Sequence, residues 1–107
     1  MADDRGELTG TRRVILVVED DVVFARVIYD LAHENGFHCL IATTAEEALA
    51  VAAQHRPSAV ILDVGLPDFS GLSVLDRLKQ DSRTRHIPVH VVSGHDHSQT
   101  ALALGAV

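Results

Sequence analysis

Apolar positions along the chain follow two alternating patterns. Short apolar runs bounded by turn residues predict four strands, at 14–18, 37–42, 59–63 and 89–92. Residues 14–18 and 59–62 are continuously apolar, which is typical of strands buried on both faces of a sheet, whereas the other two runs each contain one histidine. Between them, apolar residues recur every three or four positions, which predicts helices over roughly 21–35, from 43–47 onward, over 71–80 and over 98–104. Alternating strands and helices predict βαβ connections and a parallel sheet, hence an α/β fold.

The helical segments indicate which side chains face the core. In the first helix, Phe24, Val27, Ile28 and Leu31 form one apolar face, and in the third we expect Leu72, Leu75 and Leu78 to point inward. The second helix has two possible capping boxes, Thr43 with Glu46 or Thr44 with Glu47. The second strand contains a histidine, so we place it at an edge of the sheet.

Composition narrows the class of protein. A length of 107 residues fits one domain, and residues 1–12 lack periodicity, which predicts a flexible tail before the domain at 13–107. The net charge of −6 argues against nucleic acid or an anionic membrane as a direct partner. No apolar run approaches the roughly 20 residues of a membrane span, and no signal segment opens the chain. We therefore expect a cytoplasmic protein whose single cysteine, Cys39, is a buried thiol.

Polar side chains follow three of the predicted strands. Glu19-Asp20-Asp21 comes after the first, Asp63 ends the third, and Ser93 follows the fourth. Because parallel strands end at one rim of the sheet, these groups are expected to converge there. Clustered acids repel one another unless a cation is bound, and hard divalent ions such as Mg²⁺ prefer carboxylate oxygens. The alternative is that acids at strand ends only cap the next helix, which we expect of Asp21.

One carboxylate of such a set can also act as a nucleophile toward phosphorus. Attack would give an aspartyl phosphate, and a hydroxyl such as that of Ser93 could hydrogen-bond the arriving phosphoryl oxygens. Phosphoryl transfer of this kind depends on positioning and charge neutralisation more than on acid–base groups.

These motifs together resemble the response-regulator receiver domain of two-component signalling. The resemblance covers residues 13–107 and is carried by three segments, 15–21 (ILVVEDD), 61–67 (ILDVGLP, with Gly71) and 87–94 (IPVHVVSG). It implies a flavodoxin-like, doubly wound parallel sheet with strand order 2-1-3-4-5. It also implies a phosphoacceptor module of a phosphorelay, a signalling switch rather than a turnover enzyme.

The resemblance also assigns roles to residues and partners. Asp63 would be the phosphoacceptor and Ser93 the switch hydroxyl, while Glu19, Asp20, Asp63 and the backbone carbonyl of Gly65 would hold Mg²⁺. The phosphoryl donor would be a phosphohistidine on a histidine kinase or a histidine phosphotransfer domain. The output would act on an attached or a separate effector. The oligomeric state does not follow from the sequence.

The chain departs from the family pattern at its end. The family continues into a fifth strand, a Lys-Pro pair and a fifth helix, whereas this sequence stops at Val107, so we expect a receiver that is incomplete at its C-terminus and lacks both elements. Its one lysine is Lys79, in the third helix, so the family's phosphate-binding lysine has no match. Losing that charge-assisted contact would cost the phosphoryl group about 1.5–3 kcal/mol.

Four other interpretations stand beside this one. His90, His95 and His97 could hold zinc, but their spacing matches no standard ligand pattern. His95 could instead tune hydrolysis of the acyl phosphate. A haloacid-dehalogenase-like phosphatase would need its nucleophile and a second Asp two residues later on the first strand, which Glu19-Asp20-Asp21 does not provide. The alternative in signalling is a receiver-like docking module that is not phosphorylated.

Overall fold

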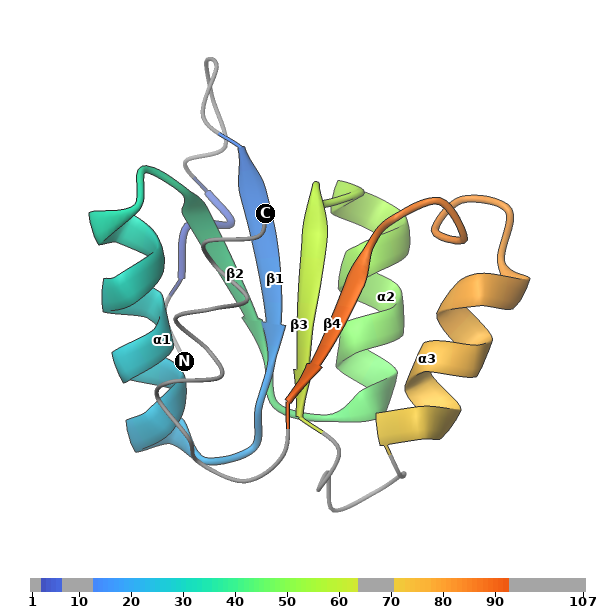
Figure 1. Cartoon of the computed structure of the whole chain (residues 1–107), viewed down its shortest axis with the longest axis horizontal. Helices are drawn as coiled ribbons and strands as arrows, with labels where there is room; N and C mark the ends of the chain where they lie inside the picture. The colour runs from blue at the N-terminus through green and yellow to red at the C-terminus, as the bar shows by residue number, and fades with distance from the viewer. Residues whose placement is uncertain (1–2, 7–12, 64–70, 93–107) are drawn as a thin grey trace.

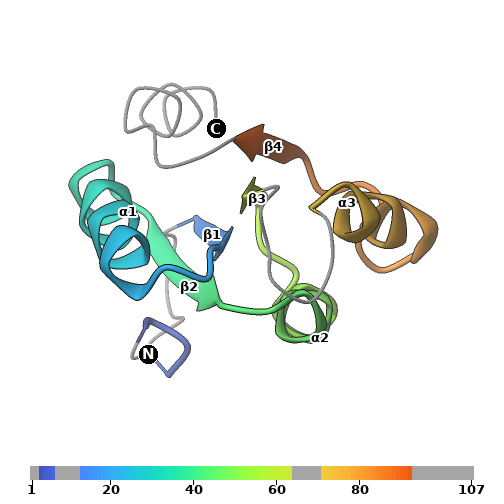
Figure 2. The same ribbon diagram turned by 90° about the horizontal axis from the view of Figure 1, so that it is seen from below.

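The computed structural model describes residues 3–6, 13–63 and 71–92. In chain order the elements are β1 (Val14–Val18), α1 (Val22–Glu34), β2 (His38–Ala42), α2 (Ala45–His55), β3 (Ala59–Asp63), α3 (Gly71–Gln80) and β4 (Val89–Val92). The strands form one parallel sheet in the order β2-β1-β3-β4, with α1 on one face and α2 and α3 on the other (Figures 1 and 2). The doubly wound parallel sheet is therefore confirmed for four strands. Residues 93–107, where a helix over 98–104 was expected, lie outside the described residues.

Both faces of the sheet are buried, as the continuous apolar runs predicted. Side chains of β1 alternate between the two layers, with Ile15 and Val17 packed on the α1 side and Leu16 and Val18 on the α2–α3 side. All five residues of β3 are buried. Burying a large aliphatic side chain contributes about 1.5–3 kcal/mol, so these two central strands anchor the fold and fix where their ends lie.

Within the described part of the sheet, the outer strands are β2 and β4. The predicted edge position of β2 is confirmed. At the other edge, β4 is less buried than β3, with His90 half-buried and Val91 exposed over 42% of its surface.

Helix caps form where the sequence indicated them. Asp21 is the N-cap of α1 and accepts hydrogen bonds from the amides of Val23 and Phe24, which confirms its structural role. Thr44 is the N-cap of α2 and accepts a bond of 3.2 Å from the Glu47 amide. The carboxylate of Glu47 reaches back to the amide of Thr43 rather than to that of Thr44, so the box is offset by one residue.

The apolar face of α3 differs from the expected one. Leu78 is buried and Leu75 partly buried, but Leu72 is 63% exposed and Val74 takes the inward position in the first turn. The prediction for Leu72 was wrong, because the helix turns through 3.6 residues and an i, i+3, i+6 row drifts off one face. Val74 and Leu78, spaced by four, lie on the sheet side instead.

Residues 3–6 behave differently from the flexible tail expected for residues 1–12. They lie beside β2, on the side away from β1 (Figure 2), and the Asp4 amide donates to the Cys39 carbonyl at 3.1 Å. Cys39 is fully buried, as predicted, and burial followed by the neighbouring Asp4 and Asp3 carboxylates raises the pKa of its thiol.

Within the described residues, none of the helices combines the length and apolarity needed to cross a membrane.

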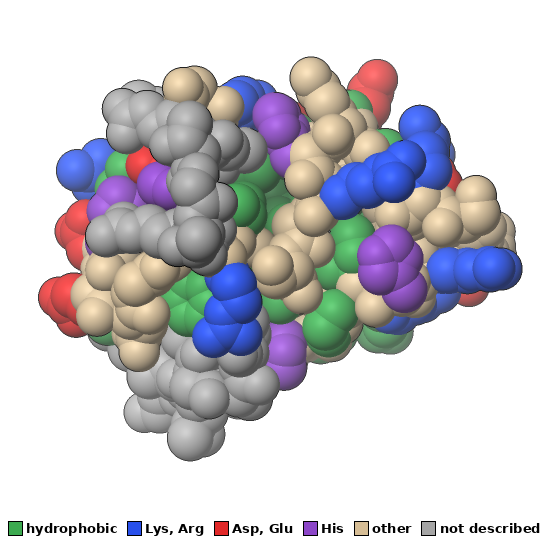
Figure 3. All heavy atoms as spheres, turned by 90° about the horizontal axis from the view of Figure 1, so that it is seen from above, with side chains coloured by type: hydrophobic (Ala, Val, Ile, Leu, Met, Phe, Trp, Pro, Cys, Tyr) green, Lys and Arg blue, Asp and Glu red, His purple; other side chains and the backbone are tan. Residues whose placement is uncertain are grey.

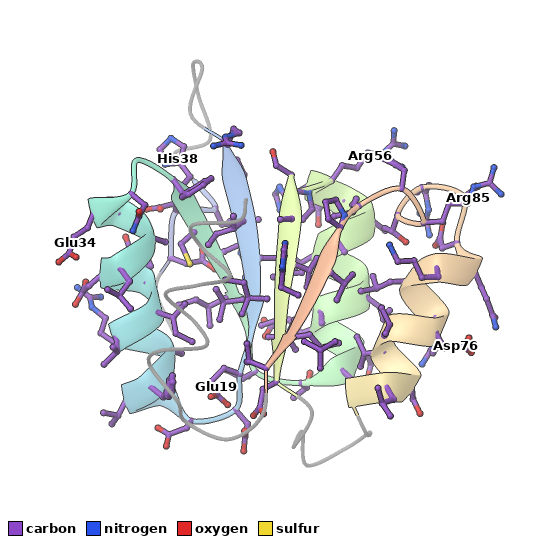
Figure 4. The ribbon with its side chains drawn as sticks, in the orientation of Figure 1. Glu19, Glu34, His38, Arg56, Asp76 and Arg85 are labelled. Atoms are coloured by element: carbon purple, nitrogen blue, oxygen red, sulfur yellow. The ribbon has the colours of Figure 1, made fainter. Side chains whose placement is uncertain are left out.

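Basic side chains gather at one end of the molecule. Figure 3 views the end from which the parallel strands start, and Lys, Arg and His side chains cluster there on the side of α2, α3 and β4. Arg56 and Arg85 mark this end in Figure 4, whereas Glu19 lies at the other end of the sheet.

Candidate functional site

Two acidic residues lie side by side at the carboxyl end of the sheet because β1 and β3 are neighbours. Val18 of β1 pairs with Leu62 of β3, so the next residues along each strand, Glu19 and Asp63, emerge at the same level. The Glu19 amide donates to the Ala42 carbonyl at the end of β2, which continues the ladder by one residue. Figure 4 shows Glu19 at this end of the sheet.

Asp20 completes a cluster of three carboxyl groups. One oxygen from each of Glu19, Asp20 and Asp63 lies within 4.8 Å of the other two. Glu19 and Asp63 are buried, with 2% and 6% of their surface exposed, while Asp20 is exposed. Two acids thus form the floor of the cluster and the third faces solvent.

The loop after β1 holds Glu19 in place. Its Oε2 accepts hydrogen bonds from the amides of Asp20, at 2.9 Å, and Asp21, at 3.4 Å. These amides belong to the turn that leads into α1, where Asp21 is the N-cap. The carboxylate is therefore fixed by backbone groups whose positions the strand and the helix determine.

Burial and two neighbouring acids disfavour the charged form of Glu19. Burial, and then the neighbouring Asp63 and Asp20 carboxyl groups, raise the pKa of Glu19 to about 8, although the backbone hydrogen bond from Asp21 acts in the opposite direction. Near neutral pH the metal-free cluster therefore retains a proton that a bound cation would displace.

The predicted site residues thus divide into two groups. Glu19, Asp20 and Asp63 are brought together as expected, whereas Gly65 and Ser93 lie outside the described residues. Residues 95 and 97, proposed as zinc ligands with His90, also lie outside them. Among the described residues, the three-acid cluster is the only group of three or more His, Cys, Asp or Glu side chains arranged to hold a metal ion.

Lys79 occupies a position remote from the acids. Its Nζ donates to the carbonyl oxygens of Arg85, at 3.2 Å, and Ile87, at 2.7 Å, in the connection from α3 to β4. This connection joins the strand at its amino end, whereas the acids lie at the carboxyl end of the sheet. The one lysine of the chain therefore binds backbone carbonyls of the connection that follows α3.

Sequence reasoning identified the three acids but not the groups that position them. Glu19 is positioned by backbone groups, namely the Ala42 carbonyl and the amides of Asp20 and Asp21. Backbone groups are the same in every residue type, so the sequence does not indicate which of them will be used. The signal available in the sequence was indirect. The strand order implied by the resemblance already placed the second strand beside the first, and the pairing of Val18 with Ala42 then brings the last carbonyl of β2 next to Glu19.

Comparisons with known proteins support the same interpretation. The family model of the response regulator receiver domain matches residues 15–107. The polar-differentiation response regulator DivK of Brucella anthropi is 37% identical over 79 residues, which cover 74% of this chain and 64% of that protein. The matched part therefore spans less than two thirds of the length of this curated relative.

Solved structures show the same architecture. A sensor protein from Polaromonas is 36% identical with a TM-score of 0.75, and the match covers 78% of this chain and 67% of that one. The receiver domain of a sensor histidine kinase from Pseudomonas aeruginosa, with magnesium coordinated in its active site cleft, is 25% identical with a TM-score of 0.72, covering 76% and 66%. With the family model matching most of its length, this chain belongs to the response regulator receiver domains of two-component signalling.

Proposed function

We propose that Asp63 accepts a phosphoryl group from a phosphohistidine, with Mg²⁺ held beside it by Glu19 and Asp20. The observation that carries this proposal is the cluster itself. A buried carboxyl group ends β3 and has two further acids within 4.8 Å, at the rim of a parallel sheet where ligands bind. The donor would be a histidine kinase or a histidine phosphotransfer domain, as in the family to which the chain belongs.

The residues present fit a magnesium ion. The donor set consists of carboxylate oxygens, which hard divalent cations prefer. Burial and the neighbouring Asp63 and Asp20 carboxyl groups raise the pKa of Glu19, and a bound cation would relieve this repulsion. Glu19, Asp20 and Asp63 would hold the ion, with the backbone carbonyl of Gly65 as a further ligand. Bound Mg²⁺ would neutralise charge on the acids and on the incoming phosphoryl oxygens.

The chain's own part in the reaction is to present a fixed nucleophile. An oxygen of Asp63 attacks phosphorus, the new O–P bond forms, and the P–N bond to the donor histidine breaks. The imidazole leaves with the electron pair of that bond, and the proton on its other ring nitrogen makes the leaving group neutral. The product is an aspartyl phosphate and a neutral histidine, so the domain is modified rather than turned over.

Phosphorylation would place charge and strong hydrogen-bond acceptors at this rim. In the proposed switch, the Ser93 hydroxyl turns toward the phosphoryl oxygens and carries the segment after β4 with it. The changed surface would then be recognised by an attached or separate effector domain.

Intact-mass spectrometry tests the proposal. The protein is incubated with Mg²⁺ and acetyl phosphate, beside a sample containing EDTA and beside two variants, Asp63→Asn and Asp76→Asn. Asp76 lies on the exposed side of α3 and serves as the matched control. We expect one phosphoryl adduct in the wild type and in Asp76→Asn, and none in Asp63→Asn or in EDTA.

Two contrary outcomes would count against the proposed phosphoacceptor, and the second would favour a docking module that is not phosphorylated. An adduct that persists in Asp63→Asn would contradict the assignment of the phosphoacceptor. A folded wild-type protein that binds Mg²⁺ but gains no phosphoryl group would favour the docking module.

A further inference from the structure

The outer edge of β2 exposes a regular set of backbone groups. In a strand, the N–H and C=O of alternate residues point to the same side. The amide of His38 donates to the Arg13 carbonyl, and the Ala42 carbonyl accepts from Glu19, so the even-numbered residues of β2 face β1. Cys39 and Ile41 therefore present both of their backbone groups to the opposite side, which no other strand of the described sheet covers.

All four of these groups have a partner in residues 3–5. At Cys39, the amide donates to Asp4 Oδ2 at 2.8 Å and the carbonyl accepts from the Asp4 amide at 3.1 Å. At Ile41, the amide donates to Asp3 Oδ2 at 2.8 Å and the carbonyl accepts from Arg5 Nη2 at 3.1 Å. Three consecutive residues thus satisfy the edge of β2 in the way that a neighbouring strand would.

Asp4 anchors this segment to α1 as well as to β2. Its carboxylate accepts a hydrogen bond from the Tyr29 hydroxyl at 2.8 Å and lies 2.6 Å from His33 Nε2. Burial alone would raise the pKa of Asp4, but the hydrogen bonds from the Cys39 amide, His33 and Tyr29 hold it below its usual value. The bond to Asp4 also raises the pKa of Tyr29 to about 12. The carboxylate is therefore ionised and fully engaged although its side chain is 4% exposed.

The segment is also braced internally. Arg5 Nη2 lies 3.0 Å from Asp3 Oδ2, and the Arg5 amide donates to Asp3 Oδ1 at 2.9 Å. On the other side Arg5 Nη1 lies 3.9 Å from Glu47 of α2. Residues 3–5 thus bridge α1, β2 and α2 (Figure 1 shows the three elements).

We infer that residues 3–5 form an edge clamp that prevents β2 from pairing with a strand of another molecule. An open edge strand is a template for association, and proteins block such edges with charged side chains. Here the carboxylates replace strand carbonyls as acceptors and the Arg5 guanidinium replaces a strand amide as donor. Three of the four bonds use side chains and only the Asp4 amide is a backbone group, so the clamp is not itself a strand with a regular ladder for another strand to join.

Hydrogen exchange and sedimentation test the clamp on this chain. Asp3→Ala removes the acceptor of the Ile41 amide, and Arg5→Ala removes the donor to the Ile41 carbonyl. Asp30→Ala, on the exposed side of α1, is the matched control, and both clamp variants spare the buried Asp4. In Asp3→Ala the Ile41 amide should exchange about five- to tenfold faster, as expected for the loss of one hydrogen bond, while the Leu40 amide, which faces β1, keeps its rate.

The second readout is self-association. In sedimentation velocity, Asp3→Ala and Arg5→Ala should form dimers at concentrations at which the wild type and Asp30→Ala do not. Unchanged exchange at Ile41 would show that the clamp does not hold the edge. Faster exchange without any added self-association would overturn the inference that the clamp blocks pairing, since an open β2 edge would then be harmless.

Discussion

Glu19 meets two opposed demands. Its position at the end of β1 buries it against Asp63, whereas the proposed role as a Mg²⁺ ligand requires it to be ionised. The pKa of Glu19 is raised because burial and then the neighbouring acids favour the protonated form when no cation is present. Like charges placed together in a buried cluster lower the stability of the metal-free protein. Binding of a cation would therefore stabilise the folded protein more.

The conflict predicts a dependence of stability on pH. The pKa of Glu19 is about 8 in the folded protein against an ordinary value of 4.5, so its protonation stabilises the fold below about pH 4.5 and that contribution is lost as pH rises through about 8. In EDTA, we expect the melting temperature to fall over this range. In Asp63→Asn the melting temperature should fall less over this range. The variant lacks the Asp63 carboxylate, which comes directly after burial among the causes that raise the pKa of Glu19.

Thermal denaturation in EDTA at about pH 5, 6.5 and 8 measures this difference, with Asp76→Asn as the control that keeps the wild-type slope. Each kcal/mol lost corresponds to a melting temperature lower by about 4–8 °C in a domain of this size. Subtracting the melting temperatures of Asp63→Asn from those of the wild type at each pH cancels the effect of histidines that titrate far from the site. Equal slopes in the two proteins would contradict the proposed coupling of Glu19 to Asp63.

At the residue scale, the sequence predicted the acids but not their environment. Glu19, Asp20 and Asp63 were identifiable because each follows a buried apolar run, and a parallel sheet brings such positions together. Asp4 was not identifiable. It lies in a polar segment without periodicity, and its partners are 25 to 35 residues away in the chain.

At the scale of elements, α3 shows how a correct helix can be assigned an incorrect face. Its bounds, Gly71–Gln80, agree with the prediction, because they depend on flanking turn residues and on the local apolar period. Its inward face depends on the sheet beneath it, and three leucines spaced by three suggested a row that the helix does not bury. Val74 replaces Leu72 because it shares a side of the helix with Leu78.

Matched leucine substitutions test this correction. Leu78→Ala removes a fully buried side chain from the α2–α3 layer and should lower the free energy of unfolding by about 2–5 kcal/mol. Leu72→Ala changes a largely exposed side chain and should lie within about 0.5 kcal/mol of the wild type. Urea denaturation of both variants measures the difference, and similar losses at the two positions would contradict the observed face of α3.

At the scale of the molecule, the two ends of the sheet differ in charge. The cluster of Glu19, Asp20 and Asp63 lies where β1 and β3 end, while Arg56 and Arg85 lie where the strands begin (Figure 4). Although the net charge is −6, acidic and basic side chains are distributed unevenly between the two ends of the sheet. The order of the strands produces the acidic end, because β1 and β3 are adjacent although a helix, a strand and a second helix separate them in sequence.

The strand order itself came from family resemblance, since spacing does not determine which strands are neighbours. Once β1 and β3 are adjacent, the apolar runs that end at Val18 and Leu62 are enough to place Glu19 beside Asp63. The fold and the acid cluster were therefore predictable together. The clamp on β2 required the three-dimensional structure, because it depends on side chains meeting backbone groups of a distant strand.

The most direct test of the central claim is to locate the phosphoryl group. The protein is phosphorylated with acetyl phosphate and Mg²⁺, reduced with borohydride, which converts an aspartyl phosphate to homoserine and releases phosphate, and digested for peptide mass spectrometry. We expect homoserine at position 63 alone, and none when Mg²⁺ is withheld. Conversion at Glu19 or Asp20, or at an exposed acid such as Asp76 with position 63 unmodified, would contradict the claim that Asp63 is the nucleophile of this site.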